Sequence, residues 1–188
     1  SVLMIDKTRP EIKFVSPVSG EVTAVNRGEK RKVLSIVVKP DAQIEYEEFG
    51  KKNVASLQGA EVKEVLLNAG MWPFIKQRPY DIVAAPLDTP RDIFVSAFYS
   101  APLAPNFDFI VKGQEADFQT GLNALAKLTN GKVYVGVRSG SVVSGVKGVE
   151  IVEVEGPHPA ANVGVQINHI KPVNKGEVVW TVNPADVI

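Results

Sequence analysis

Short apolar runs rich in β-branched residues, separated by turn residues, fill the first 40 positions of the chain. Residues 2–5, 12–15, 21–25 and 33–38 each have the composition of a short strand. Proline and glycine lie between these runs, where proline fixes φ and glycine permits positive φ. The pattern predicts a small β domain over residues 1–40, and the charged stretch at 40–56 predicts a solvated linker.

From about residue 57 the apolar spacing predicts helices. An expected helix at 61–68 carries Val62, Val65 and Leu66 on one face, and Gly70 is placed to cap its end. The clearest helical pattern covers 113–130, with Gly131 expected to end it. Its apolar residues recur at three- and four-residue spacing: Phe118, Leu122, Leu125 and Leu128. A weaker helical pattern covers 160–170.

Strands are expected at 93–98, 133–137, 149–154 and 178–182. The runs at 133–137 and 149–154 are almost continuously apolar, which is typical of strands covered on both faces. Strands that alternate with helices favour an open, largely parallel sheet. The predicted fold class is therefore a multidomain α+β and α/β chain. A partial β domain over residues 1–40 precedes a mostly parallel, Rossmann-like α/β domain over residues 57–188.

Both ends of the sequence predict unfinished elements. Ser1 leads directly into the run 2–5, so we expect the partner strands of this run to be missing and its backbone to form an unpaired edge. Asn183 followed by Pro184 is typical of a helix N-cap and first helical residue. A helix is therefore expected to start there and to continue past Ile188.

Composition excludes several kinds of chemistry. The 188 residues contain no cysteine, which excludes disulfides, thiolate nucleophiles, and cysteine ligation of zinc or iron–sulfur clusters. Two histidines are too few for a histidine-rich metal site. The 21 basic residues balance the 21 acidic ones, so no footprint for nucleic acid is indicated. No apolar run approaches the ~20 residues that a membrane helix needs, so direct membrane insertion is not expected.

The first region resembles the barrel-sandwich domains that carry lipoyl or biotinyl groups. The resemblance rests on Ile5-Asp6-Lys7 and on the later Ser16-Pro17-Val18-Ser19-Gly20. In such carriers an Asp-Lys pair at a hairpin tip presents the modified lysine, which would be Lys7 here. This sequence departs from the carriers in two ways: Pro10 lies within the expected returning strand, and Ser16-Pro17 is one residue farther from the lysine than is usual in lipoyl domains. A shift of one residue turns every side chain of a strand to the opposite face unless the turn absorbs it. Lys7 is either a carrier lysine or an ordinary surface lysine.

A series of short motifs in a fixed order relates the whole chain to one family. They include Asn26-Arg27-Gly28-Glu29-Lys30-Arg31, Gly70-Met71-Trp72, Leu128-Thr129-Asn130-Gly131-Lys132 and Gly156-Pro157-His158-Pro159-Ala160. With these motifs the chain resembles the A subunit of the bacterial sodium-translocating NADH:quinone reductases. It resembles part of such a protein, without the first N-terminal segment and a large C-terminal part.

The resemblance implies a peripheral subunit on the cytoplasmic face of the bacterial inner membrane. Its partners would be integral-membrane and other subunits of a complex that passes electrons from NADH to quinone and exports sodium. Within this oxidoreductase and translocase the chain would be non-catalytic, with NAD, FAD, FMN and iron–sulfur held by other subunits. This part alone is expected to be inactive.

The A subunit is similar to the C subunit of Rnf-type electron-transport complexes and to the flavin-binding subunit of respiratory complex I. Those relatives carry a glycine-rich loop whose backbone amides approach nucleotide phosphates. The matching segment here is Gly70-Met71-Trp72-Pro73-Phe74-Ile75-Lys76. Trp72 and Phe74 fill space that a phosphate needs, and Pro73 removes a backbone donor. This segment is therefore expected to bind no flavin.

Aromatic and cationic side chains alternate just after this segment begins, at Trp72, Phe74, Lys76, Arg78 and Tyr80. A quinone needs a flat apolar slot for its ring and donors for its carbonyl oxygens, and these residues can supply both. The same residues can instead pack between a helix and the next strand, with the cations in solvent. The segment is a candidate for contact with quinone or with a neighbouring protein of the complex.

His158 lies between two prolines just before the helical pattern at 160–170. It can present an imidazole to a cleft at the carboxyl ends of strands, or it can close the turn before the helix. His169 lies near apolar residues and is interpreted as a half-buried helix residue. Neither histidine pairs with a carboxylate or hydroxyl in a pattern typical of hydrolases.

Overall fold

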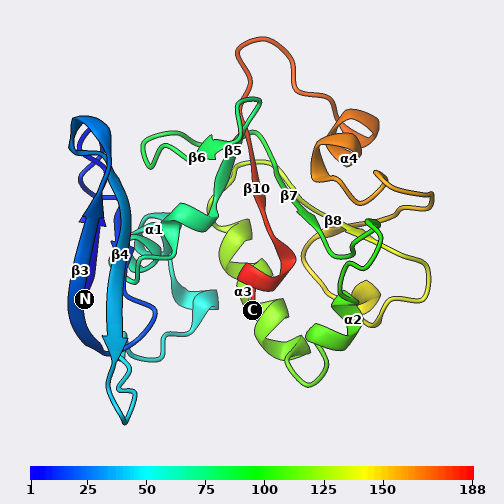
Figure 1. Ribbon diagram of the computed structural model, residues 1–188. Helices are drawn as coiled ribbons and strands as arrows, with labels where there is room; N and C mark the ends of the chain where they lie inside the picture. Colours follow the sequence, from blue (N-terminus) through cyan, green and yellow to red (C-terminus); the bar gives the residue numbers. More distant parts are fainter.

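The computed structural model describes residues 1–188 and contains three β-sheets (Figure 1). Two of them are two-stranded and lie in the first 40 residues. The first joins β1 (Val2–Ile5) to β2 (Lys13–Val15), and the second joins β3 (Gly20–Arg27) to β4 (Val33–Pro40). The four strand runs expected from the sequence are therefore all strands. Residues 41–53 form no helix or strand, as expected for a linker.

The expectation that β1 lacks a partner is wrong. β1 pairs with β2 in antiparallel register, with Met4 opposite Phe14 and Ile5 opposite Lys13. The chain can return because Asp6 accepts hydrogen bonds from the amide and hydroxyl of Thr8, which closes a compact turn. Lys7 is exposed at this turn. A hairpin therefore forms within the first 15 residues.

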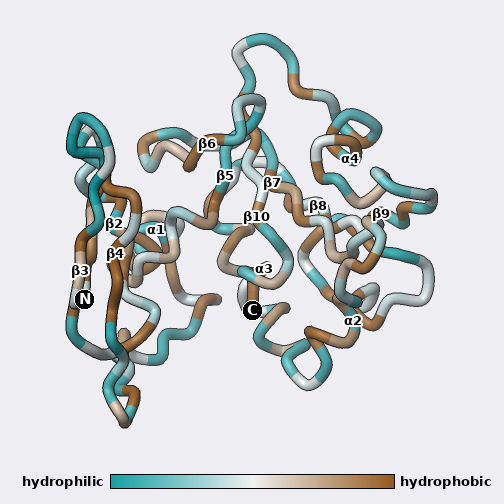
Figure 2. Tube along the Cα trace, viewed as in Figure 1, coloured by the Kyte–Doolittle hydropathy of each residue, from teal (hydrophilic) through white to brown (hydrophobic).

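The β3–β4 hairpin is long and has one markedly apolar face. Val22 and Val25, which pair with Val38 and Ile36, share this face with Leu34, and all three are more than two fifths exposed; Val37, at 43%, is exposed on the opposite face. Figure 2 shows hydrophobic stretches along both strands of this hairpin as well as in the larger sheet. An exposed apolar sheet face of this kind is typical of an interaction surface.

The third sheet has six strands in the order β6-β5-β10-β7-β8-β9. Its strands are β5 (Lys76–Arg78), β6 (Ile82–Val83), β7 (Ile93–Ser96), β8 (Val133–Val137), β9 (Glu150–Glu153) and β10 (Val179–Val182). β10, β7, β8 and β9 are mutually parallel, whereas β5 and β6 add an antiparallel edge. The sheet is mostly parallel, as predicted, but the sequence analysis missed β5 and β6.

The helices are α1 (Gly59–Asn68), α2 (Phe107–Ile110), α3 (Glu115–Ala126) and α4 (Val163–Ile170). α1 begins with a capping box between Gln58 and Glu61. It ends, as predicted, at Gly70 with positive φ, where the amide of Met71 donates to the carbonyl of Leu66. No helix of the chain is both long and apolar enough to cross a membrane.

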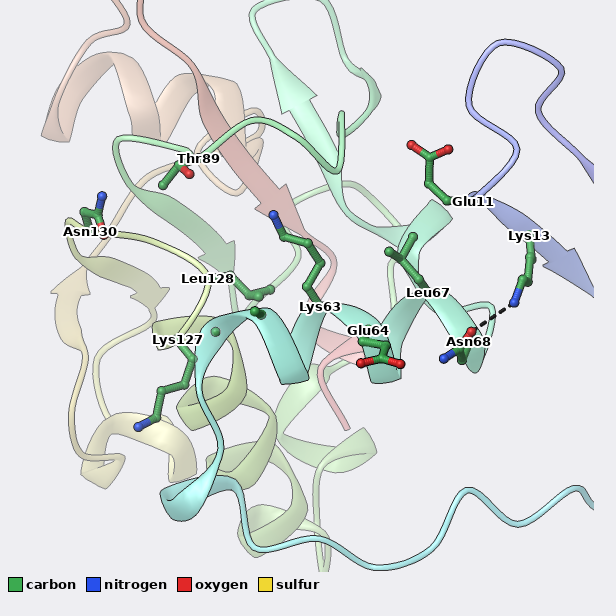
Figure 3. Close-up of a pocket in the computed structure, with 12 residues that line it drawn as sticks. Glu11, Lys13, Lys63, Glu64, Leu67, Asn68, Thr89, Lys127, Leu128 and Asn130 are labelled. Carbon is green, nitrogen blue, oxygen red and sulfur yellow. Dashed lines mark hydrogen bonds between the residues drawn. The ribbon is translucent and has the colours of Figure 1, made fainter.

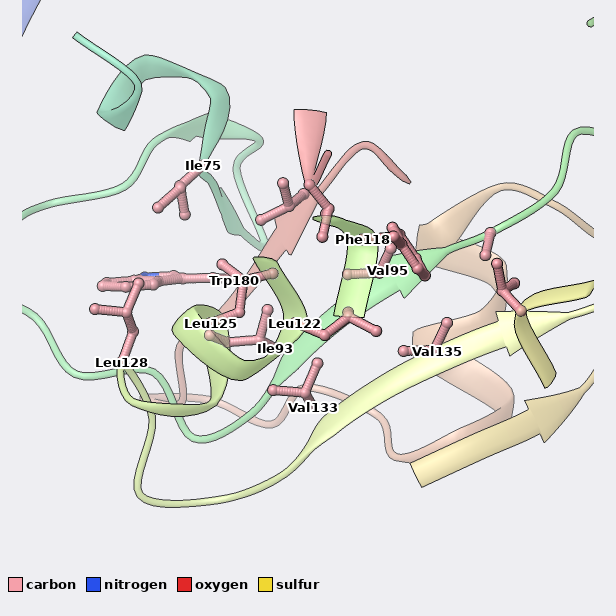
Figure 4. Packing of buried hydrophobic residues seen from close by; sticks show 14 of the residues in the cluster. Ile75, Ile93, Val95, Phe118, Leu122, Leu125, Leu128, Val133, Val135 and Trp180 are labelled. Carbon is pink, nitrogen blue, oxygen red and sulfur yellow. The ribbon is translucent and has the colours of Figure 1, made fainter. Parts of the chain in front are cut away.

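The two faces of the sheet are covered by different helices. Ile93, Val95 and Trp180 point toward α3 and form the main core with its apolar residues Phe118, Leu122 and Leu125 (Figure 4). On the opposite face Phe94 and Val179 pack against Ile167 of α4. The alternation of side chains along each strand explains why neighbouring residues join different cores.

Two local expectations need correction. β9 lies at the sheet edge with Glu150 and Glu153 exposed, so it is not covered on both faces. Gly131 does not end α3, which stops at Ala126; it is required because a Cβ there would lie 1.9 Å from the Arg91 carbonyl oxygen. Asn183 is the N-cap residue of a 3-10 turn, η5 (Pro184–Asp186), as its pattern with Pro184 predicts.

The first hairpin packs onto the α/β region. Ile12 is 1% exposed and belongs to the main core. The guanidinium of Arg9 donates to the carbonyl of Val83 (3.0 Å), and the ammonium of Lys13 donates to Asn68 Oδ1 (2.9 Å). These contacts join residues more than 50 positions apart. Through Ile12 and the partly buried Phe14 of β2, the first hairpin therefore shares the hydrophobic core of the six-stranded sheet.

Candidate functional site

A cavity of about 910 Å³ lies at the carboxyl ends of β7 and β10. Neighbouring parallel strands commonly bind ligands at this end of an open α/β sheet. The walls come from four places: β5 and the 3-10 turn η3 (Trp72–Phe74) before it, the loop after β7, the first turn of α4, and η5. Segments from residue 14 to residue 186 therefore meet at one site.

Three of the six predicted contact residues line this cavity, namely Phe74, Lys76 and Arg78. Phe74 is 46% exposed and stands at the rim. Lys76 and Arg78 are half-buried and lie two positions apart on β5, so both point to the same face of the sheet. The structure thus brings together the aromatic and cationic groups that the sequence placed close to each other.

Trp72 does not reach the cavity because it is completely buried in the main core. Its indole Nε1 donates to the carbonyl of Ala84 (2.8 Å). The rings of Trp72 and Trp180 form a T-shaped pair with their centroids 5.4 Å apart. Tyr80 is 82% exposed and lies in the loop between β5 and β6, away from the lining. The structure thus separates these two aromatic residues from Phe74.

His158 is exposed and lies outside the cavity lining. Its Nδ1 lies 3.3 Å from Ser100 Oγ, and this hydroxyl oxygen also accepts from the amide of Ala161 (3.0 Å). His158 thus helps to close the loop before α4, and Asn162 rather than His158 is the N-cap residue. His169 is exposed in the last turn of α4, so its half-buried assignment is wrong.

The floor of the cavity is polar. Thr181 of β10 is 5% exposed and pairs with Lys76 of β5 on one side and Phe94 of β7 on the other. Ser96 is 8% exposed; its hydroxyl donates to the carbonyl of Ala161 (2.8 Å) and accepts from the Gln166 amide (2.9 Å). These side chains share the α4 face of the sheet.

Acidic and phenolic groups lie near η5. Burial raises the pKa of the Asp186 carboxyl, an effect that the nearby charge of Lys76 only partly offsets. Burial and then the Asp186 charge raise the pKa of Tyr99. The Tyr99 hydroxyl donates to Asn183 Oδ1 (2.9 Å), which fixes the ring beside the cavity. No group of three or more His, Asp or Glu side chains is arranged to hold a metal ion.

A second, smaller hollow of about 500 Å³ lies where the first hairpin meets α1. Figure 3 shows Glu11 and Lys13 facing α1 across this hollow, with Lys63, Glu64 and Asn68 along the helix. Acidic and basic groups alternate around it, and Lys13 already donates to Asn68. The hollow therefore has the character of a solvated joint between segments.

Sequence reasoning missed the residues of the cavity floor. Thr181, Ser96 and Asn162 lie in strands and a loop that the sequence analysis treated as scaffold. Thr181 carries a usable signal, since a threonine within a continuously apolar strand places a hydroxyl where burial is expected. The pairing of β5 with β10, which brings Lys76 to Thr181, has no signal in the sequence.

The chain thus has an N-terminal β region followed by an α/β region. The cavity of the α/β region lies beside the segment 70–76. Family models match both regions. The "NqrA N-terminal barrel-sandwich hybrid domain" matches residues 1–41, and the "NqrA second alpha/beta domain" matches residues 57–188. The chain therefore belongs to the NqrA family.

Curated relatives agree with this assignment. Each is named as the A subunit of a Na(+)-translocating NADH-quinone reductase. The chain is 37% identical to the proteins of Neisseria meningitidis serogroup A and Photorhabdus laumondii, and 39% identical to that of Vibrio anguillarum. Each comparison covers all of the chain and 43% of the relative. The chain thus spans less than half the length of the relatives it matches.

Proposed function

We propose that this chain is part of a peripheral, flavin-free subunit of a sodium-pumping NADH:quinone reductase, on the cytoplasmic face of the bacterial membrane. The names of its relatives support the assignment to this complex. The partners would be the integral-membrane and other subunits, with NAD, FAD, FMN and iron–sulfur bound elsewhere. The chain would supply docking surfaces and no catalytic residue.

The packing of the segment at 70–76 carries the flavin-free part of the proposal. Trp72 occupies this position with no exposed surface, and its indole is hydrogen bonded to Ala84. Pro73 has no backbone N–H to donate to a phosphate, and it follows the buried Trp72 directly in the 3-10 turn η3. A flavin phosphate would have to displace a tryptophan that packs against Trp180.

Purified protein should therefore show no flavin absorbance and no oxidation of NADH. Titration with FMN should give no saturable quenching of flavin fluorescence. Stoichiometric FMN binding with a dissociation constant near a micromolar, roughly −8 kcal/mol, would contradict the proposal.

The cavity rim is the surface proposed to contact quinone or a neighbouring protein of the complex. Phe74 and Pro73 at the rim supply apolar area beside the ammonium of Lys76. Truncating Phe74 to alanine should raise the KM for quinone about tenfold or weaken assembly of the complex. Phe109→Ala removes an equally large ring, 79% exposed, from α2 and serves as the matched control. Equal KM values and equal assembly in the two variants would contradict this role.

A carrier role for Lys7 is the second candidate, favoured by its exposure at the tip of the first hairpin. The mass of the intact protein from its native host tests it. An added lipoyl or biotinyl group that disappears in Lys7→Arg would establish the carrier, whereas an unmodified mass leaves Lys7 as a surface residue.

A further inference from the structure

The Thr181 hydroxyl group opens to the cavity and has no partner in the protein. The residue as a whole is only 5% exposed and lines the cavity floor, but its hydroxyl oxygen stays accessible and makes no hydrogen bond within the protein. The nearby Ser96 hydroxyl is instead engaged with Ala161 and Gln166. The Thr181 hydroxyl, which can donate and accept, is therefore free to bind a group that enters the cavity.

The first turn of α4 faces the same cavity with free donors. Asn162 is the N-cap residue, and its side chain does not cap the helix. The amides of Val163 and Gly164 donate to no group of the protein, and both residues line the cavity. Free amides and the helix dipole together make a helix N-terminus attractive to oxyanions.

Two cations stand beside this turn. The Lys76 ammonium makes no hydrogen bond or ion pair, and Lys76 lies directly across the sheet from Thr181. Arg78 Nη1 would lie 3.8 Å from a Cβ added at Gly164, so the guanidinium touches the first turn of α4. A cation beside a helix N-terminus is unfavourable, because the dipole there is positive. A bound anion would turn this repulsion into attraction.

The carboxylate of Asp81, which pairs with Arg78, does not accept a hydrogen bond from its guanidinium. Asp81 Oδ1 lies 3.4 Å from Arg78 Nε, but Asp81 is more than half exposed and the contact lacks hydrogen-bond geometry. Arg78 Nε is consequently buried without a hydrogen-bond partner. Asp186 borders the same cavity and lies close enough to Lys76 for their charges to interact, so its carboxylate competes with a bound anion for this ammonium.

We propose that the floor of this cavity binds an oxyanion, the phosphate or carboxylate group of a small molecule, through the Thr181 hydroxyl, the Lys76 ammonium, the Arg78 guanidinium and the Val163 and Gly164 amides. Phe98 and Pro184 border the same cavity, so the preferred ligand carries its anionic group on an apolar or aromatic body. This site goes beyond the proposed function, because a quinone carries no anionic group.

Titration calorimetry on the full-length protein at low ionic strength tests the site, with inorganic phosphate and phenyl phosphate as probes. Both should bind with one-to-one stoichiometry, and phenyl phosphate should bind more tightly. Thr181→Val and Lys76→Gln should each weaken binding about tenfold, the effect of one hydrogen bond to a charged group. Asp186→Asn should tighten binding, because it removes a nearby negative charge.

Lys175→Gln is the matched control, since Lys175 is exposed and lies outside the cavity lining. Thr181→Val should unfold at about the same temperature as the parent protein, because the Thr181 hydroxyl makes no hydrogen bond within the protein that the substitution could remove. Weaker binding in a protein of undiminished stability identifies the hydroxyl as a ligand contact.

Equal affinities in the parent protein, Thr181→Val and Lys175→Gln would overturn the proposal, as would the absence of saturable phosphate binding. Either failure would leave the reductase assignment unaffected, because that assignment is measured by assembly and quinone reduction in the complex.

Discussion

Asp92 is a fully buried carboxylate at the start of β7 that holds three segments together. It accepts hydrogen bonds from the Arg91 guanidinium (2.7 Å) and the Lys132 amide (3.1 Å), and it pairs with the Lys171 ammonium at 2.7 Å. Burial alone would raise its pKa, but the hydrogen bonds from Lys171, Lys132 and Arg91 outweigh burial and lower it. The ionised carboxylate is therefore the form that stabilises the fold.

Asp92→Asn should lower the free energy of unfolding by about 2–4 kcal/mol, because it leaves the Lys171 ammonium without its buried counter-charge, whereas Arg91 keeps its ion pair with Glu177. A lowered folded-state pKa means that this stabilisation is complete above the unfolded-state pKa and is lost as the pH falls through the folded-state value. The difference between parent and variant should be constant from about pH 5 to 8 and shrink below about pH 4. Urea unfolding at several pH values measures it.

Asp41→Asn, in the exposed segment after β4, provides the control and should leave stability unchanged at every pH. A difference between Asp92→Asn and the parent that persisted undiminished at about pH 2, below the ordinary range of carboxylate pKa values, would refute the electrostatic explanation.

At the scale of elements, α3 packs very closely against the backbone of the C-terminal segment. Gly121 lies within this helix, and a Cβ there would come 1.9 Å from the carbonyl oxygen of Val187. The C-terminal segment after η5 therefore crosses α3 at a distance that only glycine permits. Val187 is 6% exposed in the main core, which shows that this crossing closes one end of the core.

Gly121→Ala should destabilise the protein by more than about 2 kcal/mol, because the added methyl group collides with the backbone of the terminal segment. Helix propensity alone would favour alanine by about 1 kcal/mol, so the predicted sign is opposite to that of an ordinary helix glycine. Gly145→Ala is the matched control, because a Cβ there meets no atom within 4 Å and its φ is not positive. Thermal unfolding of the two variants decides the matter. A more stable Gly121→Ala would show that the terminal segment moves away at little cost.

At the scale of the whole molecule, the first hairpin and the α/β region are one packed body. Ile12 carries this connection because it lies in the main core, whereas Ile5 on the neighbouring strand is 50% exposed. The β3–β4 hairpin, with its exposed apolar face, extends away from this core (Figure 1). Residues 1–15 and 57–188 should therefore unfold together.

Ile12→Ala should cost about 2–5 kcal/mol, and Ile5→Ala should cost far less because its side chain is already half in water. Unfolding monitored by tryptophan fluorescence, which reports on Trp72 and Trp180, should shift with the Ile12 variant and remain one transition. Amide hydrogen exchange should be comparably slow in β2 and β8. Rapid exchange in β2 beside a protected β8 would mean that the hairpin opens independently.

Local patterns in the sequence determined most of the elements. β-branched runs and turn residues located the four short strands of the first region, because both act through neighbouring residues. The periodic apolar positions of α1 and α3 and the glycine cap at Gly70 were likewise local signals. The motif order assigned the chain to its family, and the segment at 70–76 gave the prediction, still to be tested, that no flavin binds there.

Tertiary structure alone decided the rest. β5 is short and polar and β6 has only two residues, so neither has a signal of its own; β5 pairs with the free edge of β10, and β6 pairs with β5. Phe74 is exposed at the cavity rim whereas Trp72 is completely buried, although the two residues are only two positions apart. The cavity floor joins Lys76, Gly164 and Thr181 from distant parts of the chain. Sequence spacing carries no information about such contacts, because they depend on strand order and helix placement.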